Sequence, residues 1–138
     1  ASKLGMERAV SLTHPDLAQV YEWTYDSSGG RRISPEILDS LGPLGVATWL
    51  ADDGTLGKRR YVIYTNRYPL ADVERAAEWF RQRFGWSPRV SQHKPGRYVL
   101  VFPAAYYEPI RLVLLEQIGT VSCLRYKTGD RSFKEYAV

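Results

Sequence analysis

The sequence is poor in cysteine and histidine, and each shortage excludes a class of site. A single cysteine, Cys123, cannot form an internal disulfide or a cysteine-based metal site, and its apolar neighbours predict a buried thiol in a reducing compartment. The two histidines, His14 and His93, lack metal-ligand spacing, and no serine–histidine–aspartate or cysteine–histidine set has a sensible context. A phosphate-binding glycine loop is missing as well. Hydrolases and nucleotide-binding enzymes of those types are therefore not expected.

Long apolar runs are also missing. No stretch approaches the length that a membrane span requires, and no charged-then-apolar leader opens the chain, so neither a membrane partner nor secretion is expected. We interpret residues 1–5, ahead of Met6, as a cloning remnant and residues 6–138 as a single domain. Asparagine occurs once (Asn66) and arginine outnumbers lysine. This bias favours an intracellular protein, in the cytoplasm or nucleoid of a GC-rich or thermophilic microbe, over an organellar one.

What is present is the composition of one folded, basic domain. The 138 residues are 44% hydrophobic and 25% charged, which is enough for one hydrophobic core. The formal net charge is +4. Guanidinium groups suit phosphates and guanine edges, so nucleic acid is a compatible partner. The charge by itself is a weak signal, because many basic proteins bind no nucleic acid.

Hydrophobic periodicity predicts an α+β fold, with a small, mostly antiparallel sheet and helices packed on one of its faces. Helices are expected over residues 14–25, 43–53, 69–84 and 104–117, with a helical turn over 34–41. Strands are expected over residues 60–65, 89–94 and 97–102, and Pro95-Gly96 joins the last two into a hairpin. Gly85 closes the third helix, as a glycine just past a helix end does.

One stretch, residues 41–54, carries most of the chemical information. Its apolar helix has small residues at three positions, Gly45, Ala47 and Ala51, and runs directly into Asp52-Asp53-Gly54. The helix macrodipole disfavours two carboxylates at a C-terminus, so they need a compensating cation, for which a divalent metal is the natural choice. The alternative is a buried amphipathic helix that ends in an Asp-Asp-Gly turn. This stretch alone does not decide between the two.

The wider pattern resembles the LAGLIDADG homing endonuclease family, in the branch whose motif reads L-A-x-W-x-x-D-D-G. In residues 44–54 the matching positions are Ala47, Trp49, Asp52, Asp53 and Gly54. Upstream, RRISP at 31–35 is similar to that branch's basic-basic-Ile-x-Pro segment. Downstream, YTNRY at 64–68 resembles its strand ending in Thr-x-x-aromatic, and LRYK at 124–127 resembles its closing Met-x-Tyr-Lys. The four motifs stand in the family's order and cover about residues 21–127.

The resemblance implies a site-specific DNA endonuclease that hydrolyses phosphodiester bonds with a divalent metal. Asp53 would bind the metal, usually Mg²⁺, with Mn²⁺ as a substitute and Ca²⁺ occupying the site without turnover. Asp52 would lie beside that site or at an interface. Lys127 matches the family's active-site lysine, and Gln92 or His93 would hold the water network near the scissile phosphate.

The resemblance also implies two partners, double-stranded DNA and a second copy of the chain. The predicted hairpin takes the place of the family's DNA-reading sheet, and its alternation puts Arg89, Ser91 and His93 on one face. The predicted DNA contacts are Arg31, Arg32, Arg59, Arg60, Arg67, Arg89, Ser91, His93, Lys94 and Arg97. A lone motif implies a symmetric homodimer on a roughly palindromic site. The predicted dimer contacts are Gly45, Ala47, Thr48, Ala51 and Asp52.

Two other hypotheses stay open. The first is a relative that binds nucleic acid without cutting it, such as an intron-splicing maturase or a DNA-binding regulator. The presence of both Asp53 and Lys127 argues against it, because a pure binder has no need of a carboxylate beside phosphates. The second is an inactive half-domain, or a fragment of a longer chain, that assembles with another chain.

Overall fold

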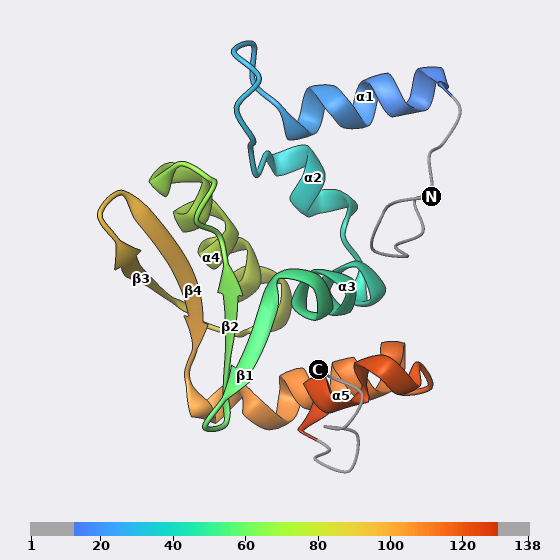
Figure 1. The fold of residues 1–138 in the computed structure, drawn as a ribbon, viewed down its shortest axis with the longest axis vertical. Coiled ribbons are helices and arrows are strands. Elements are labelled where there is room, and N and C mark those ends of the chain that lie inside the picture. Colours follow the sequence, from blue (N-terminus) through green and yellow to red (C-terminus); the bar gives the residue numbers. More distant parts are fainter. Residues whose placement is uncertain (1–12, 130–138) are drawn as a thin grey trace, which may run out of the picture.

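Helices cover one face of a four-stranded sheet in the computed structural model, which describes residues 13–129 (Figure 1). The helices of this part are α1 (Pro15–Thr24), α2 (Pro35–Ser40), α3 (Pro43–Asp53), α4 (Leu70–Phe84) and α5 (Tyr107–Ile118), with the 3-10 turns η1 (Ala104–Tyr106) and η2 (Ser122–Thr128). The strands are β1 (Gly54–Gly57), β2 (Arg60–Tyr64), β3 (Arg89–Lys94) and β4 (Arg97–Phe102). The predicted α+β class is confirmed. The predicted cloning remnant lies outside the described residues.

The sheet has the order β1-β2-β4-β3, and all its neighbouring strands are antiparallel. Strand β1 was not predicted, because its sequence, GTLG, lacks the β-branched and aromatic residues that mark strands. Pairing creates it: the chain leaves α3, turns through Lys58 and Arg59, and comes back along β2, with Gly54 opposite Ile63. The sequence therefore predicts three of the four strands and misses β1.

Proline and glycine mark several helix boundaries where the sequence predicted them. Pro15, Pro35 and Pro43 each occupy the first residue of a helix, where the missing N–H costs nothing. The N–H of Ile37 donates a 3.2 Å hydrogen bond to the side chain of Ser34, the residue that caps α2. Gly85 ends α4 in the left-handed conformation, with φ of 72°. Boundary chemistry thus fixes where the helices start and stop.

The core lies between the sheet and helices α3, α4 and α5, and its centre is aromatic. Phe80 on α4 is completely buried, and its ring centroid lies 5.8 Å from that of Trp49 on α3. The Phe80 ring also meets Phe102 on β4 edge to face at 5.1 Å. Burying one such side chain contributes about 2–3 kcal/mol. Because Trp49 belongs to this cluster, the core fixes the helix that carries the acid pair.

One sequence prediction about the core is wrong. Cys123 was expected to be buried, but it is exposed on η2. A 3-10 helix has about three residues per turn, so neighbouring residues face different ways. Leu124, the next residue, packs against the core instead.

In residues 13–129, no helix is both long enough and apolar enough to span a membrane.

Candidate functional site

The two neighbouring aspartates lie at the junction between α3 and the first strand of the sheet. Asp52 and Asp53 are the last residues of α3, both are exposed, and the last turn of the helix contains no basic residue. Gly54 follows and begins β1 at once. A Cβ atom on Gly54 would lie 2.3 Å from the carbonyl oxygen of Leu50, so the strand can leave the helix here only at a glycine. The Asp53 carboxylate is therefore presented at a fixed place beside the sheet.

Lys127 reaches the same place from a distant part of the chain. Its Nζ donates a hydrogen bond to the carbonyl oxygen of Gly54, 73 residues away in the sequence. Its own carbonyl oxygen accepts a 2.9 Å hydrogen bond from the hydroxyl of Tyr61. A cation at a helix C-terminus offsets the carbonyl ends and the nearby carboxylates. The fold thus brings Lys127 to the residue next to Asp53, while the catalytic roles of both stay predictions.

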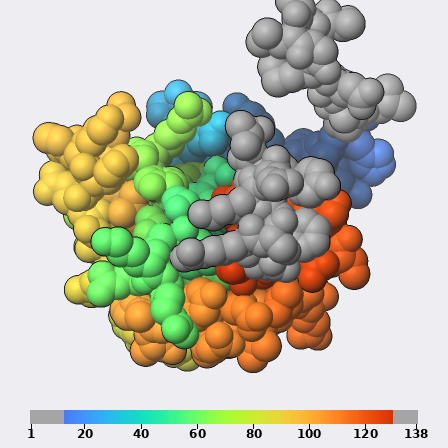
Figure 2. Space-filling model, turned by 60° about the horizontal axis from the view of Figure 1, so that its bottom comes forward, coloured from blue at the N-terminus to red at the C-terminus, as the bar shows by residue number. Residues whose placement is uncertain are grey.

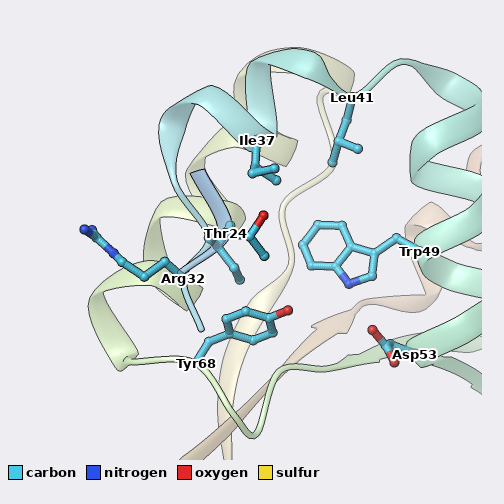
Figure 3. A pocket seen from close by; sticks show the side chains of 8 residues that line it. Thr24, Arg32, Ile37, Leu41, Trp49, Asp53 and Tyr68 are labelled. Carbon is cyan, nitrogen blue, oxygen red and sulfur yellow. The ribbon is translucent and has the colours of Figure 1, made fainter. Parts of the chain in front are cut away.

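Two hollows flank Asp53, and Tyr68 lines both of them. The apolar hollow has a volume of about 190 Å³, and its other lining residues are Thr24, Arg32, Ile33, Ile37, Leu41 and Trp49 (Figure 3). The polar hollow has a volume of about 370 Å³, and its other lining residues are Arg31, Tyr64, Asn66 and Arg67. The Tyr68 hydroxyl and the Asp53 carboxylate face the space beside Trp49 (Figure 3). Asp53 therefore borders both an apolar space and a strongly polar one.

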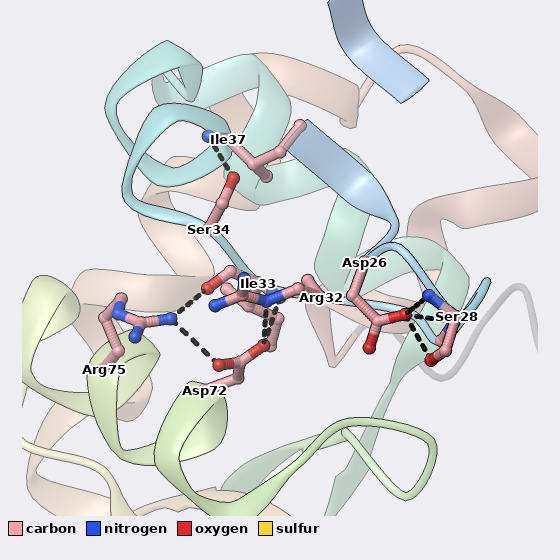
Figure 4. A network of polar contacts seen from close by, with 9 residues as sticks. Asp26, Ser28, Arg32, Ile33, Ser34, Ile37, Asp72 and Arg75 are labelled. Atoms are coloured by element: carbon pink, nitrogen blue, oxygen red, sulfur yellow. Dashed lines mark hydrogen bonds and ion pairs between the residues drawn. The ribbon is translucent and has the colours of Figure 1, made fainter. Parts of the chain in front are cut away.

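A buried carboxylate fastens the segment that carries Arg31 and Arg32 to α4 (Figure 4). Asp72 is 3% exposed and accepts 2.9 Å hydrogen bonds from the N–H of Ile33 and from Arg75. Arg75 also donates to the carbonyl oxygen of Ile33 at 2.8 Å, and Arg32 Nε lies 3.7 Å from Asp72. The guanidinium of Arg32 therefore helps to hold this segment, and its DNA contact stays a prediction. Sequence reasoning missed Asp72, which looked like an ordinary acid in the first turn of a helix.

A tight turn precedes Arg31. Asp26 accepts hydrogen bonds from the Ser28 hydroxyl at 2.7 Å and from the Gly30 N–H at 2.8 Å, and these bonds hold the pKa of Asp26 below its usual value (Figure 4). Tyr25 and Arg31 form an antiparallel bridge across the turn. The backbone is thus fixed on both sides of Arg31, whose side chain lines the polar hollow.

The sheet turns one face to the helices and the other face outward. Val90 on β3 pairs with Leu100 and packs against the core. Arg89 and Ser91, its neighbours along β3, therefore face outward, as alternation predicts. The β3–β4 hairpin (yellow to orange) stands out at one side of the molecule in Figure 2. This gives the two side chains an open surface.

A bulge lies at His93, the last of the three residues that alternation places on the outward face. The register of β3 shifts between Gln92 and Lys94. Ser91 and Tyr64 both pair with Val99 and so share the outward face, and His93 lies beside Tyr64 on that face. The His93 ring lies 5.7 Å from the ring of Tyr64, and its Nδ1 lies 3.4 Å from Asn66 Oδ1. Both partners line the polar hollow. His93 is thus beside that hollow, whereas within residues 13–129 Gln92 makes no side-chain hydrogen bond to the residues that line it, and its role stays a prediction.

Other predicted DNA-contact cations lie at the hairpin ends. Lys58 and Arg59 form the two-residue turn between β1 and β2, with φ values of 47° and 63°. Residues with a Cβ atom adopt this left-handed conformation at a cost of about 1–2 kcal/mol. The Arg59 guanidinium carbon lies 4.9 Å from the centre of the Tyr107 ring, a cation–π contact. The other exposed cations of the predicted set in the two hairpins are Arg60, Lys94 and Arg97.

The outer side of α3 only partly matches the predicted dimer contacts. The exposed or half-buried positions of that prediction are Gly45, Thr48, Ala51 and Asp52, and Leu44, 57% exposed, lies on the same side. Ala47 is completely buried in the core of its own chain, so this part of the prediction is wrong. Gly45 makes room inside the chain as well, because a Cβ atom there would lie 2.8 Å from a leucine side chain one turn earlier.

Asp53 is suited to hold part of a divalent-metal site. Among residues 13–129, no cluster of three or more histidine, cysteine, aspartate or glutamate side chains gathers to hold a metal ion. The Asp53 carboxylate is exposed and makes no ion pair within that range. Mg²⁺ in proteins commonly takes one or two carboxylates and fills its shell with water and phosphate oxygens. Asp53 fits one side of such a site, and the remaining ligands would come from DNA, water or another chain.

Two comparisons with known proteins gave a match, one to a family and one to a fold. The model of the LAGLIDADG DNA endonuclease family matches residues 6–108. A solved structure of the homing endonuclease I-WcaI bound to its DNA recognition sequence is similar, with a TM-score of 0.74 and 17% sequence identity. The match covers 83% of this chain and 53% of that one, so this chain spans about half the length of I-WcaI. At this identity the likeness shows the fold. No curated protein gives a significant match.

Proposed function

Because the chain belongs to the LAGLIDADG DNA endonuclease family, we propose that it is a homing endonuclease that cleaves double-stranded DNA with a divalent metal. The observation that carries the proposal is the meeting of Lys127 with Gly54, directly beside Asp53. A carboxylate for a metal and an ammonium group for a phosphate then stand together at one helix end. A protein that only binds DNA has no use for that pair.

In this proposal Asp53 holds Mg²⁺, or Mn²⁺ in its place, and Asp52 lies beside it. The bound metal would lower the pKa of an attacking water and stabilise the leaving oxygen. Lys127 offsets negative charge at the phosphate or orients the water. Its backbone is held by the Tyr61 hydroxyl at 2.9 Å, so its position is fixed before DNA binds. His93, beside the polar hollow, belongs to the water network near the phosphate.

The outward face of the sheet is the proposed DNA-reading surface. Arg89 and Ser91 lie on this face, and cations stand at both hairpin ends. A β-ribbon of this width fits the major groove, where arginine pairs with guanine. The exposed side of α3 is the proposed contact with a second copy, which would supply a second Asp53. The match covers 53% of the I-WcaI chain, and a second copy of this chain would supply a counterpart to the rest.

The test is cleavage of a randomised pool of DNA sites in Mg²⁺ by the native protein and by Asp53→Asn. We expect selective cutting by the native protein, at a roughly palindromic site, and none by the variant. The variant keeps the side-chain shape but loses a charge that the metal needs. Sedimentation of the protein with the selected site then reports whether two copies bind.

Three other outcomes of these experiments would contradict parts of the proposal. Tight, selective binding without cutting would favour a non-cleaving maturase or regulator. Cutting that survives in Asp53→Asn would place the metal at another residue. Cutting of a site without symmetry, by a single copy, would refute the homodimer.

A further inference from the structure

The polar hollow beside Asp53 contains two arginines whose charge is not balanced. Arg31 comes from the loop after α1 and Arg67 from the loop after β2, and both are exposed. Within residues 13–129, neither guanidinium makes an ion pair with a carboxylate. Arg32 and Arg75, close by, both pair with Asp72. The hollow therefore concentrates positive charge that the protein itself does not neutralise.

Asp53 lines the same hollow without neutralising these arginines. No ion pair joins its carboxylate to Arg31 or Arg67, so more than 4.0 Å separates the charged atoms. The volume of about 370 Å³ leaves room for a group between them. A tetrahedral anion suits that space, because guanidinium groups donate paired hydrogen bonds to phosphate oxygens.

Both arginines stand on rigid supports. Asp72 and Arg75 hold the backbone of Ile33, two residues after Arg31. Arg67 lies in a turn closed by a 3.1 Å hydrogen bond from the N–H of Tyr68 to the carbonyl oxygen of Thr65. Thr65 is completely buried and donates through its hydroxyl to a β4 carbonyl at 2.7 Å. The two supports hold the backbone segments that carry Arg31 and Arg67 before a ligand arrives, so binding has to order only the two side chains and not the loops.

We propose that the polar hollow binds one backbone phosphate of the cleaved DNA strand, held by Arg31 and Arg67 next to Asp53. This inference rests on the proposed function and narrows it. Among the predicted cations, these two act at the reacting centre, whereas Arg60, Arg89 and Arg97 act along the sheet. Tyr64, Asn66 and Tyr68 complete the wall of the site.

The test measures whether the contribution of each arginine to DNA affinity depends on the charge of one particular phosphate. The full chain and its variants Arg31→Gln and Arg67→Gln are titrated, in Ca²⁺, with duplexes of the selected site that each carry one neutral methylphosphonate. The control is Arg83→Gln, because Arg83 lines a separate hollow with Asp39, Trp79 and Gln82. Thermal melting of every variant checks that the fold is retained.

We expect one position next to the cut where the neutral linkage weakens binding by the native protein and by Arg83→Gln by roughly tenfold, as loss of charge-assisted hydrogen bonds does. The same linkage should change binding by Arg31→Gln and Arg67→Gln less than about twofold, because the contact is already lost. Arg31→Lys should keep the salt dependence of binding but lose most of this position dependence, since lysine lacks the planar fork.

Three results would overturn the assignment or its basis. If the native protein cuts DNA but neither arginine couples to a phosphate more than Arg83 does, the phosphate site is wrong and the nuclease stands. If the native protein binds and never cuts, the nuclease proposal is wrong. Coupling of both arginines to one phosphate would then still support a phosphate site, and absence of coupling would overturn that site as well. If it binds no duplex at low salt, both proposals are wrong.

Discussion

Removing one hydroxyl, in Tyr61→Phe, should loosen the position of Lys127 by deleting one of its two hydrogen bonds to β1 and β2, the other being from its Nζ to Gly54. Tyr61 on β2 is 2% exposed, and its ring stacks on that of Tyr107 with centroids 5.9 Å apart. Its hydroxyl donates 2.9 Å to the carbonyl oxygen of Lys127. Burial raises the pKa of Tyr61 far above its usual value, so the hydroxyl stays protonated at any working pH. Phenylalanine keeps the ring packing and deletes only the donor.

The size of the effect follows from that single bond. Leaving a buried acceptor without its partner costs about 1–3 kcal/mol, and Lys127 is half-buried, so we expect a loss near the lower end. A loss of about 1.4 kcal/mol in the placement of Lys127 corresponds to a roughly tenfold slower cleavage step. The affinity for DNA in Ca²⁺ should stay the same, because Tyr61 presents no surface to DNA.

The assays are urea unfolding followed by tryptophan fluorescence, and single-turnover cleavage of the selected site in Mg²⁺. The control is Tyr21→Phe, whose tyrosine is 58% exposed on α1. A raised pKa in the folded state means that native stability falls above pH about 10, where the unfolded tyrosine ionises first, and Tyr61→Phe should lose this component. Cleavage at the native rate, in a variant that is destabilised, would refute the positioning role and leave a purely structural one.

Three further changes test other parts of the fold. Gly54→Ala puts a Cβ atom 2.3 Å from the Leu50 carbonyl oxygen, so we expect a loss of more than about 2 kcal/mol in urea unfolding; a loss below about 0.5 kcal/mol would show that the turn relaxes freely. Asp72→Asn removes a buried charge that faces two arginines, so we expect it to lower the free energy of unfolding by about 2–3 kcal/mol and to slow cleavage. Urea unfolding and single-turnover rates measure the two effects. Native-like values of both would show that Asp72 does not hold the segment that carries Arg31 and Arg32. Lys58→Asn should stabilise by about 0.5–1 kcal/mol in thermal melting, whereas Lys58→Val should destabilise, because asparagine tolerates positive φ; equal melting temperatures would argue against strain in the turn.

Local chemistry made much of the fold predictable. Proline at helix starts and Gly85 at a helix end act within a few residues, so their effect can be read from the sequence. The hairpin around Gly96, with φ of 71°, is predictable for the same reason. The prediction of Asp53 and Lys127 as one site came from motif order. Lys127 contacts Gly54, the residue after Asp53 and 73 residues away in the sequence, while the site itself stays a prediction.

Apart from the exposure of Cys123, the errors share a cause: each depends on a pairing or packing partner that the local residues do not reveal. Strand β1 exists because β2 lies beside it, and its own residues give no strand signal. Ala47 looked like a contact residue because it is small, but the direction of its side chain is set by packing against the core. Asp72 binds the backbone of Ile33, 39 residues earlier, and nothing in the local sequence marks such a bond. The bulge at His93 is equally invisible in the sequence, although it leaves His93 on the predicted face.

The charge distribution around Asp53 bears on whether this site cuts DNA or only binds it. A surface built only to bind DNA gains from cations and loses from every carboxylate near a phosphate. Here two carboxylates end a helix whose dipole already disfavours them, and no basic residue in the last turn of α3 relieves this. Lys127 bonds to the backbone next to them, while Arg31 stands across the hollow without an ion pair. A bound metal would offset the repulsion between the two carboxylates and a bound phosphate that between the cations, so we expect the protein to melt at a higher temperature with both ligands than with either alone.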